Sequence, residues 1–391
     1  STYRAQKRGG KGRAGLSLKE EDVTTKVFVA NTHTPMLFFS TDGMAYKLKT
    51  YKLPMGNPQS KGRSMVNIFP LDKDESISVV MPLPEDEENW EDLNIIFATA
   101  KGNIRRNSLA DFQSVRANGK IAIKLDDDDE LVGVMVAEPN QHIMLSTYQG
   151  KSIRFPVDSV RVFKGRNSSG VRGISLGKDD RVISMAVLNG AEVDTEVKDN
   201  YLRIPLENRI EIAKMLPSAY SPDSALNDDA QIDPEKPITI QLLNETNHSD
   251  LAEKIENLVK ESDSEISVDD AISYARAEEF ILSITEKGYG KRSSAYEYRI
   301  TNRGGKGIVN IVTNQRNGNV SASFPVVEED QIMLVTDAGK LIRCPVVDIR
   351  VAGRNTQGVT IFRIDDQESI VSAARIANED EGDEQNEEIS E

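Results

Sequence analysis

The chain has 391 residues, 38% of them hydrophobic, and a formal net charge of −15 at pH 7. It has no run of eighteen apolar residues and no signal-peptide pattern, which indicates a soluble, intracellular protein. Its single cysteine, Cys344, excludes an internal disulfide and a multi-cysteine zinc site. The histidines His33, His142 and His248 lie far apart in the sequence, so we expect no metal site built from Cys and His.

The negative charge is concentrated in two segments. Residues 378–391 carry eight acids and no base, and residues 191–277 carry twenty acids and eight bases. The rest of the chain has 40 bases and 35 acids. The sequence therefore predicts a mildly basic body with two acidic segments.

An apolar stretch that ends in a glycine recurs along the chain, mostly at intervals of about fifty residues. These first glycines are Gly43, Gly102, Gly150, Gly288 and Gly339. A second glycine follows each of them after 17 to 20 residues, at Gly62, Gly119, Gly170, Gly307 and Gly358, and Gly12 supplies one more copy. Four residues after each second glycine stands an apolar residue: Leu16, Val66, Ile123, Ile174, Ile311 and Phe362.

This pattern predicts about four short strands in each repeat, with turns of Gly, Asp and Asn between them. Small four-stranded units repeated around a ring are typical of β-propellers, which protect their sheet edges in this way. Five repeats are complete. The first keeps only its second half, so we expect the chain to begin inside a first, truncated blade. Residues 1–187 then form blades one to four, and residues 278–377 form blades five and six.

One interval is much longer than the others, because 138 residues separate Gly150 from Gly288. The sequence therefore predicts an insertion at residues 188–277, which is acidic and partly helical or disordered. Helical spacing of apolar residues predicts helices from Asp250 to Lys260 and from Val268 to Ala277, with Asp250 or Ser267 as N-cap. Residues 378–391 are typical of a disordered acidic tail.

Basic residues also recur with the repeat. One stands four residues after every first glycine, at Lys47, Arg106, Arg154, Arg292 and Arg343. A second base precedes most of the second glycines by three or four residues, at Arg8, Arg116, Arg166, Arg303 and Arg354. Any one of them is more simply an ordinary solvated residue. Their recurrence around a ring predicts a basic band that contacts the phosphates of bent duplex DNA.

A glycine-rich basic loop stands near the N-terminus, at Gln6, Lys7, Arg8, Gly9, Gly10, Lys11 and Gly12. Its glycines let backbone N–H groups and cationic side chains approach phosphates closely. The spacing of a nucleotide-binding P-loop is absent. Taken alone, such a loop is more often a plain turn. Residues 302–307, which include Arg303 and Lys306, repeat the pattern as NRGGKG.

The loop resembles the QRRGGKG box of the DNA gyrase A C-terminal domain, with Lys7 in place of the usual arginine. The stretches ANTHTPMLFFSTDG, RANGKIAIKL, NSSGVRGISLG, EKGYGKR and GRNTQGV resemble the same family. The resemblance covers residues 1–187 and 278–377. Lys7 keeps the positive charge but loses the planar, bidentate guanidinium.

The resemblance implies an all-β fold, a six-bladed pinwheel of four-stranded blades that wraps double-stranded DNA. It also implies a place in a gyrase complex with the rest of the gyrase A protein, as a dimer, and with the gyrase B protein, in an A2B2 assembly that supercoils DNA negatively with ATP. This chain is then non-catalytic and cytoplasmic, and monomeric in isolation. ATP and Mg²⁺ would be used elsewhere in the complex, with no cofactor here.

Three other functions are weaker alternatives. The corresponding domain of topoisomerase IV has the same fold but lacks an intact box. A propeller that binds proteins would show an apolar or mixed-charge perimeter. An enzyme is the weakest alternative, because no histidine has a nearby nucleophile motif. The run Asp126–Asp129 lacks the spacing of a calcium loop and predicts a β-turn.

The two acidic segments permit two explanations. They can compete with DNA for the basic perimeter, since a flexible polyanion resembles the phosphate backbone. They can equally serve solubility or a contact with a partner. The sequence does not decide between them.

Overall fold

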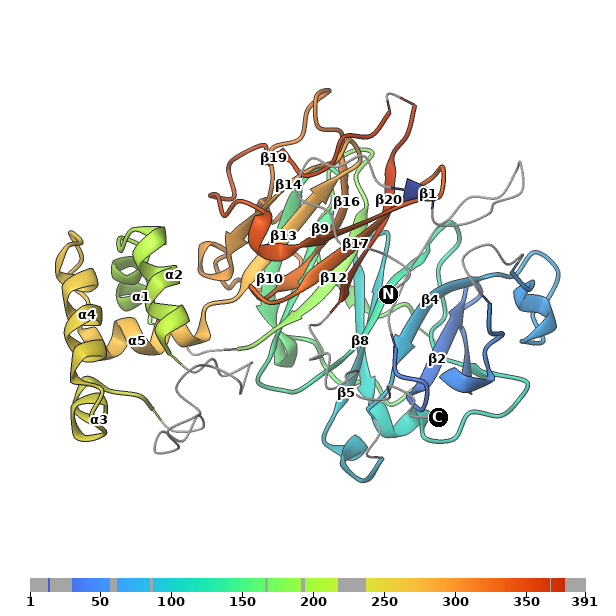
Figure 1. Cartoon of the computed structure of the whole chain (residues 1–391). Coiled ribbons are helices and arrows are strands. Elements are labelled where there is room, and N and C mark those ends of the chain that lie inside the picture. The colour runs from blue at the N-terminus through green and yellow to red at the C-terminus, as the bar shows by residue number, and fades with distance from the viewer. Residues whose placement is uncertain are drawn as a thin grey trace, which may run out of the picture. The chain divides into compact units, whose positions relative to one another are not determined.

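The structure is a computed structural model that describes residues 13–14, 30–56, 62–84, 87–165, 168–190, 194–216, 237–365 and 367–376. It contains two compact units. Unit 1 consists of residues 1–189, 280–293 and 297–391, and carries the strands (Figure 1). Unit 2 consists of residues 190–279 and 294–296, and carries the α-helices.

Unit 1 contains five four-stranded antiparallel sheets within its described residues. In each sheet two strands form a hairpin, an inner strand pairs with the first hairpin strand, and a short outer strand pairs with the second. From inner to outer strand, the sheets are β4 (Ile77–Pro82), β2 (Pro35–Ser40), β3 (Met44–Lys49) and β7 (Lys120–Ile121); β8 (Leu131–Ala137), β5 (Asn94–Thr99), β6 (Asn103–Ser108) and β11 (Val171–Arg172); β12 (Val182–Leu188), β9 (His142–Thr147), β10 (Lys151–Pro156) and β15 (Ile308–Val309); β16 (Val320–Val326), β13 (Phe280–Thr285), β14 (Tyr289–Ser294) and β19 (Val359–Thr360); β20 (Ile370–Ile376), β17 (Gln331–Thr336), β18 (Lys340–Pro345) and β1 (Arg13–Ala14).

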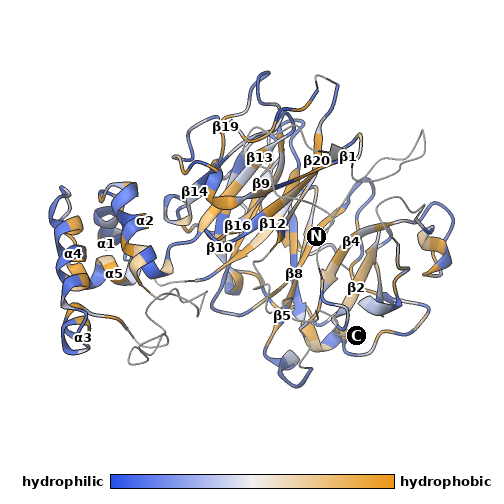
Figure 2. Ribbon diagram, viewed as in Figure 1, coloured by the Kyte–Doolittle hydropathy of each residue, from blue (hydrophilic) through white to orange (hydrophobic). Residues whose placement is uncertain are grey.

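The hairpins form where the sequence places the first glycines. Every residue of β2, β5 and β9 is buried, because these strands lie in the middle of their sheets, and Figure 2 shows the strands as mainly hydrophobic. Each three-residue turn ends in a glycine with positive φ, such as Gly43 at 78° and Gly150 at 85°. In four of the turns a Ser or Thr hydroxyl before the turn accepts a hydrogen bond from the N–H four residues later, at 3.1–3.2 Å.

The outer strand of each sheet comes from a different repeat than its hairpin. β7 follows β6 in the chain, yet it pairs with β3 of the preceding repeat. The register is the same in all five sheets: the residue after the second glycine pairs with the residue two positions after the first glycine. β1 obeys the same rule, with Arg13 opposite Leu341, so it joins the sheet of the last hairpin. Neighbouring repeats are therefore interlocked by exchanged strands.

The first glycines bind the backbone next to the exchanged outer strands. The carbonyl of Gly43 accepts hydrogen bonds from the N–H groups of Ala122 (2.9 Å) and Ile123 (3.2 Å), next to the exchanged strand. The carbonyls of Gly102, Gly150 and Gly288 each accept the corresponding pair. A Cβ on Gly43 would lie 2.1 Å from the carbonyl oxygen of Ile123. Glycine is thus required both for the turn and for the approach of the next repeat.

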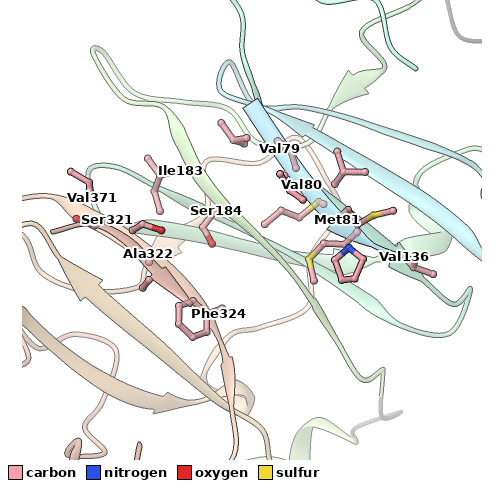
Figure 3. A pocket seen from close by; sticks show the side chains of 18 of the residues that line it. Val79, Val80, Met81, Val136, Ile183, Ser184, Ser321, Ala322, Phe324 and Val371 are labelled. Carbon is pink, nitrogen blue, oxygen red and sulfur yellow. The ribbon is translucent and has the colours of Figure 1, made fainter. Parts of the chain in front are cut away.

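The inner strands β4, β8, β12, β16 and β20 pack against one another in this order. Their side chains line a cavity of about 660 Å³, in which valines, methionines and Phe324 predominate (Figure 3). Short 3₁₀ turns follow or flank the hairpins: η1 (Thr50–Lys52), η2 (Met65–Asn67), η3 (Glu88–Glu91), η4 (Leu109–Phe112), η5 (Val157–Ser159), η7 (Ala295–Glu297) and η8 (Val346–Asp348).

Unit 2 contains α1 (Thr195–Tyr201), α2 (Leu206–Met215), α3 (Ile240–Glu245), α4 (Ser249–Lys260) and α5 (Val268–Ala277). They surround an apolar core that includes Tyr201, Ile255 and Ile272. The two helices that the sequence predicted in this segment correspond to α4 and α5. The Ser267 hydroxyl accepts from Asp270 N–H at 3.1 Å, as an N-cap does. Asp250 was the wrong N-cap, because α4 begins one residue earlier, after His248.

The predicted all-β fold of four-stranded units is confirmed. The predicted strand around Val66 was wrong, because this residue belongs to η2 and is 57% exposed. Its counterparts Ile123, Ile174, Ile311 and Phe362 are buried, as expected. The predicted tail at residues 378–391 and, apart from Arg13–Ala14, residues 1–29 lie outside the described residues, so the expected truncated first blade stays a prediction.

Candidate nucleic-acid interface

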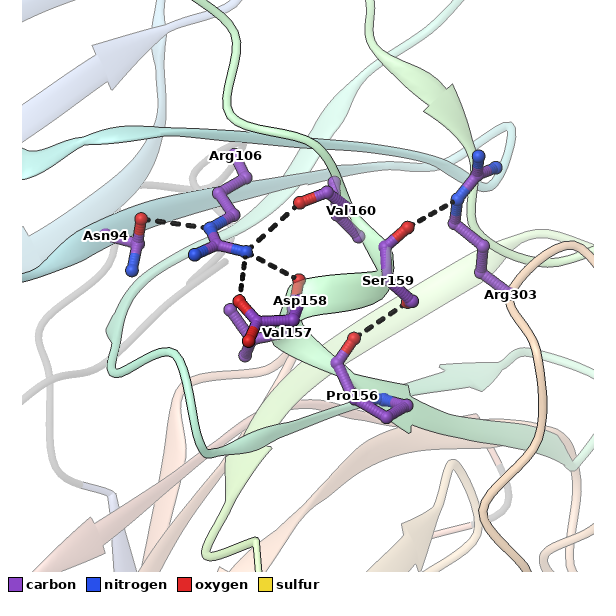
Figure 4. A network of polar contacts seen from close by, with 8 residues as sticks. All are labelled: Asn94, Arg106, Pro156, Val157, Asp158, Ser159, Val160 and Arg303. Carbon is purple, nitrogen blue, oxygen red and sulfur yellow. Dashed lines mark hydrogen bonds and ion pairs between the residues drawn. The ribbon is translucent and has the colours of Figure 1, made fainter.

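Five basic residues each stand four positions after a first glycine. Their side chains point mainly into the protein. Arg106, Arg154 and Arg292 are only 8%, 4% and 4% exposed. Arg106 donates from Nη1 to Asp158 Oδ1 at 2.7 Å and to the carbonyls of Val157 and Val160 at 3.2 Å (Figure 4). These acceptors belong to or adjoin η5 of the next repeat. Arg106 therefore fastens one blade to the next.

Two of the equivalent bases, Arg292 and Lys47, make similar contacts. Arg292 donates to the carbonyl of Ile349, after η8, at 2.8 Å and forms an ion pair with Glu328. Lys47 donates to the carbonyl of Gln113, after η4, at 3.1 Å and to Glu87 at 2.9 Å. Satisfied buried cations of this kind stabilise a contact between elements.

Three of the five bases also donate a hydrogen bond to the residue twelve positions earlier, at the start of their own hairpin. Arg106 donates to Asn94 Oδ1 at 2.9 Å, Arg343 donates to Gln331 Oε1 at 2.7 Å, and Arg154 donates to His142 Nδ1 at 3.2 Å. Burial, with the nearby Arg154 guanidinium second, lowers the pKa of His142 to about 4. The neutral imidazole is thus the form that accepts this hydrogen bond.

The predicted role of these five bases in DNA binding stays a prediction. Their geometry favours a structural role, since the guanidinium groups of Arg106 and Arg292 are directed to acceptors in the protein.

The described members of the second set, Arg116, Arg303 and Arg354, lie on what we call the rim loops: residues 113–119, 160–170, 298–307 and 349–358. Each rim loop runs from a 3₁₀ turn to an exchanged outer strand, and so lies at the outer edge of the sheets. Arg116 is exposed. Arg303 and Arg354 are half-buried and donate to backbone carbonyls, among them Ser159 and Glu297.

Other residues predicted to bind DNA lie outside the described part of the chain. These are Arg166 and the box residues Gln6, Lys7, Arg8, Gly9, Gly10, Lys11 and Gly12. Lys306, in the loop that repeats the box, is described and exposed.

The rim loops carry further exposed cations that the two spacing rules missed. Arg161, Arg299 and Arg350 are exposed, and each stands eleven residues after a first glycine. Together the four rim loops contain nine bases and no acid, in a chain with an excess of acids. This charge bias is visible in the sequence once the loop boundaries are known.

Two buried cations lie beneath rim loops. Arg105 is fully buried and donates to the carbonyls of Gly165 and Ser168. Lys291 is also fully buried and donates to the carbonyl of Gly353 at 2.6 Å. Burial lowers the pKa of Lys291 to about 7, against the smaller opposing effect of Glu297. Both side chains support the backbone of a rim loop from below.

The cavity between the inner strands is mainly apolar, with the serines Ser184, Ser321 and Ser372 as its side-chain hydroxyls. Among the described residues no three His, Cys, Asp or Glu side chains gather in a way that could hold a metal ion. None of the described helices combines the length and the apolar character that crossing a bilayer requires.

The comparisons with known proteins agree with this architecture. A family model described as "DNA gyrase C-terminal domain, beta-propeller" matches residues 1–31, 35–84, 93–138, 141–189, 279–326 and 330–377. The chain belongs to the DNA gyrase C-terminal domain family. The six matched segments follow the repeat and leave out residues 190–278, which make up most of unit 2.

Among curated proteins, the DNA gyrase A protein of Rickettsia bellii is 49% identical over 391 residues, which are 100% of this chain and 39% of that protein. The DNA gyrase A protein of Escherichia coli K12 is 34% identical over 377 residues, covering 96% of this chain and 33% of that protein. The chain thus spans about two fifths or less of the length of these relatives.

Two solved structures have the same fold. A DNA gyrase A C-terminal domain superposes with a TM-score of 0.66 at 19% identity, covering 96% of this chain and 93% of that one. The C-terminal domain of a DNA topoisomerase IV superposes with a TM-score of 0.58 at 18% identity, covering 94% and 86%.

Proposed function

We propose that this chain binds duplex DNA along its rim loops and wraps it, as the DNA-wrapping domain of a DNA gyrase A protein. The observation that carries the proposal is the charge of the rim loops, nine bases without an acid, repeated at the outer edge of successive sheets. Phosphate contacts supply binding that does not depend on base sequence, and contacts spaced along a curved surface favour bent DNA.

In the complete complex, the wrap would present a DNA crossover to the cleavage core, so that negative supercoils form with ATP bound by the gyrase B protein. The partners would be the rest of the gyrase A protein, as a dimer, and the gyrase B protein, in an A2B2 assembly. This domain would be non-catalytic, with ATP and Mg²⁺ used elsewhere in the complex. The expected location is the cytoplasm, on the chromosome.

The proposal is tested by capturing DNA topology. Relaxed plasmid is incubated with the chain, treated with a nicking-closing enzyme, and the linking-number shift is read on a gel. A shift of one sign that grows with protein concentration supports wrapping. The variant Lys7/Arg8/Lys11→Ala should reduce the shift if the box residues contribute. DNA binding without any shift by the unaltered chain would contradict wrapping.

A triple variant tests the rim loops themselves. Arg161/Arg299/Arg350→Ala removes three exposed cations, so the slope of log affinity against log salt should fall by about three. Lys178→Ala is the matched control, because Lys178 is exposed but lies outside the rim loops. An equal loss of affinity per charge in the control would show that the rim loops have no special role.

A further inference from the structure

The rim loop that repeats the box contains a small cavity. Its volume is about 210 Å³, and it lies between the loop and strand β10. Arg154, Arg299 and Lys306 line it together with Thr301 and Asn302, and no carboxylate is among its lining residues. A concave site with three cations and no acid suits an anion.

Several groups at the cavity have no partner among the described residues. Arg299, Asn302 and Lys306 are exposed, and their side chains make no hydrogen bond or ion pair within the described ranges. The N–H groups of Gly305, Lys306 and Gly307 likewise donate no hydrogen bond to any described residue. Successive free N–H groups beside a cation are what phosphate-binding loops offer.

The protein holds this loop in a fixed shape. Gly304 has a φ of 83° and donates from its N–H to the carbonyl of Gly173 at 2.6 Å. The carbonyl of Gly305 accepts from Ser175 N–H at 2.8 Å. Arg303 donates to the carbonyls of Ser159 and Arg172 at 3.0 and 3.1 Å. The loop is thus anchored from the side of the preceding repeat, which leaves Lys306 available.

The register relates this loop to the box. Gly307 directly precedes β15 and Gly12 directly precedes β1, and both strands pair with their hairpins by the same rule. Lys306, Gly305, Gly304 and Arg303 therefore hold the positions of Lys11, Gly10, Gly9 and Arg8. We propose that the cavity binds a backbone phosphate of duplex DNA, which makes residues 301–307 a second anchoring loop on the rim. The inference rests on the proposed function.

The first test removes the two free cations. Arg299/Lys306→Ala should lower the salt dependence of DNA binding by about two and reduce the linking-number shift of the unaltered chain. Lys178→Ala is the control for charge alone. The thermal midpoint should not change, since neither side chain has a partner in the described structure.

A second variant leaves the charge unchanged. A Cβ on Gly305 would lie 3.6 Å from Ile153, another residue of the cavity wall, and at ordinary contact distance. Gly305→Ala should therefore fold normally, narrow the cavity and weaken DNA binding several-fold. Wild-type affinity in both variants would overturn the inference.

The outcomes separate the two proposals. If the unaltered chain gives no linking-number shift, the proposed function fails. If it wraps DNA and Arg299/Lys306→Ala wraps equally well, the second anchoring loop alone is wrong. In parallel, inorganic phosphate is titrated into the chain, and its binding is monitored by NMR through the amide resonances of Gly305 and Gly307. Saturable phosphate binding in the protein, with DNA binding unaffected in both variants, would identify a site for free phosphate and also overturn the inference.

Discussion

Arg106 and Asn94 face each other across one hairpin, with Nε donating to Oδ1 at 2.9 Å, while the other end of the same guanidinium contacts the next blade through Asp158. One side chain thus joins the start of its own hairpin to the 3₁₀ turn that follows the next one. The base is repeated in every described sheet, and its partner twelve residues earlier is Asn, His or Gln in three of them.

The first prediction concerns this link between blades. Arg106→Met should lower the free energy of unfolding by about 3 kcal/mol, because it removes the hydrogen bonds of the buried guanidinium to the carbonyls of Val157 and Val160 and to the Asn94 side chain. Urea unfolding measures the loss. Once corrected for the folded fraction, DNA affinity should change little.

Arg116→Ala is the control, and should behave in the opposite way. Arg116 is exposed on a rim loop and has no side-chain partner among the described residues. Its loss should weaken DNA binding and leave stability within about 0.5 kcal/mol. If Arg106→Met weakened DNA binding more than Arg116→Ala at equal folded fraction, a phosphate contact for Arg106 would be supported instead.

The second prediction concerns acid stability. The pKa of His142 is about 4 in the folded chain and near 6.5 when unfolded. The unfolded chain therefore binds more protons between these values, and stability falls as pH drops from 6.5 to 4. His142→Gln, which copies the Gln331–Arg343 pair, should remove roughly 1–2 kcal/mol of this loss, allowing for solvent screening. If stability fell equally with decreasing pH in the wild-type chain and in His142→Gln between pH 6.5 and 4, this prediction would be contradicted.

The third prediction concerns Lys291 at alkaline pH. Its pKa is about 7 in the folded chain, while the unfolded chain keeps the proton up to about its ordinary 10.5. Stability should therefore rise with pH between 7 and 10.5, relative to a chain without this amine. Lys291→Ile copies the equivalent positions Ile153 and Ile342 and is the comparison. The variant also loses the hydrogen bond to Gly353, which changes its free energy of unfolding at every pH. Only the slope of stability against pH therefore tests the pKa of Lys291.

Glu297 and Arg354 are the charged groups that act on Lys291, and both are present in the wild-type chain and in the variant. Urea unfolding at intervals from pH 6 to 10 gives the two slopes. Equal slopes would show that the buried amine keeps its ordinary pKa.

The sequence contained enough to predict the repeats, the hairpins and their turn glycines, because these depend on local alternation and turn chemistry. It could not reveal the strand exchange. Ile121 pairs with Met44 of another repeat, and periodicity does not say which hairpin a short strand joins. The burial of Arg106 was missed for the same reason, since its partners lie about fifty residues away in the next blade.

The rim loops were predicted only in part. Arg116, Arg303 and Arg354 followed from their distance to a second glycine, whereas Arg161 and Arg299 keep a constant distance only from the first. The cavity beside Lys306 required the fold, because it forms between a loop and a strand of different repeats.

The last prediction tests whether the first glycines lock the exchanged strands. Gly150 has a φ of 85°, and a Cβ there would lie 2.3 Å from the carbonyl oxygen of Ile311, which follows β15. Gly150→Ala therefore adds backbone strain of about 1–2 kcal/mol and also forces apart the hydrogen bonds from Asn310 and Ile311 to the Gly150 carbonyl. We expect a total loss above about 3 kcal/mol, measured by urea unfolding. Gly177→Ala should cost less than about 0.5 kcal/mol, because the nearest atom to its Cβ would be Gln149 Oε1 at 3.9 Å. Similar small losses in both variants would mean that the repeats are held together by packing of the inner strands and not by the exchange.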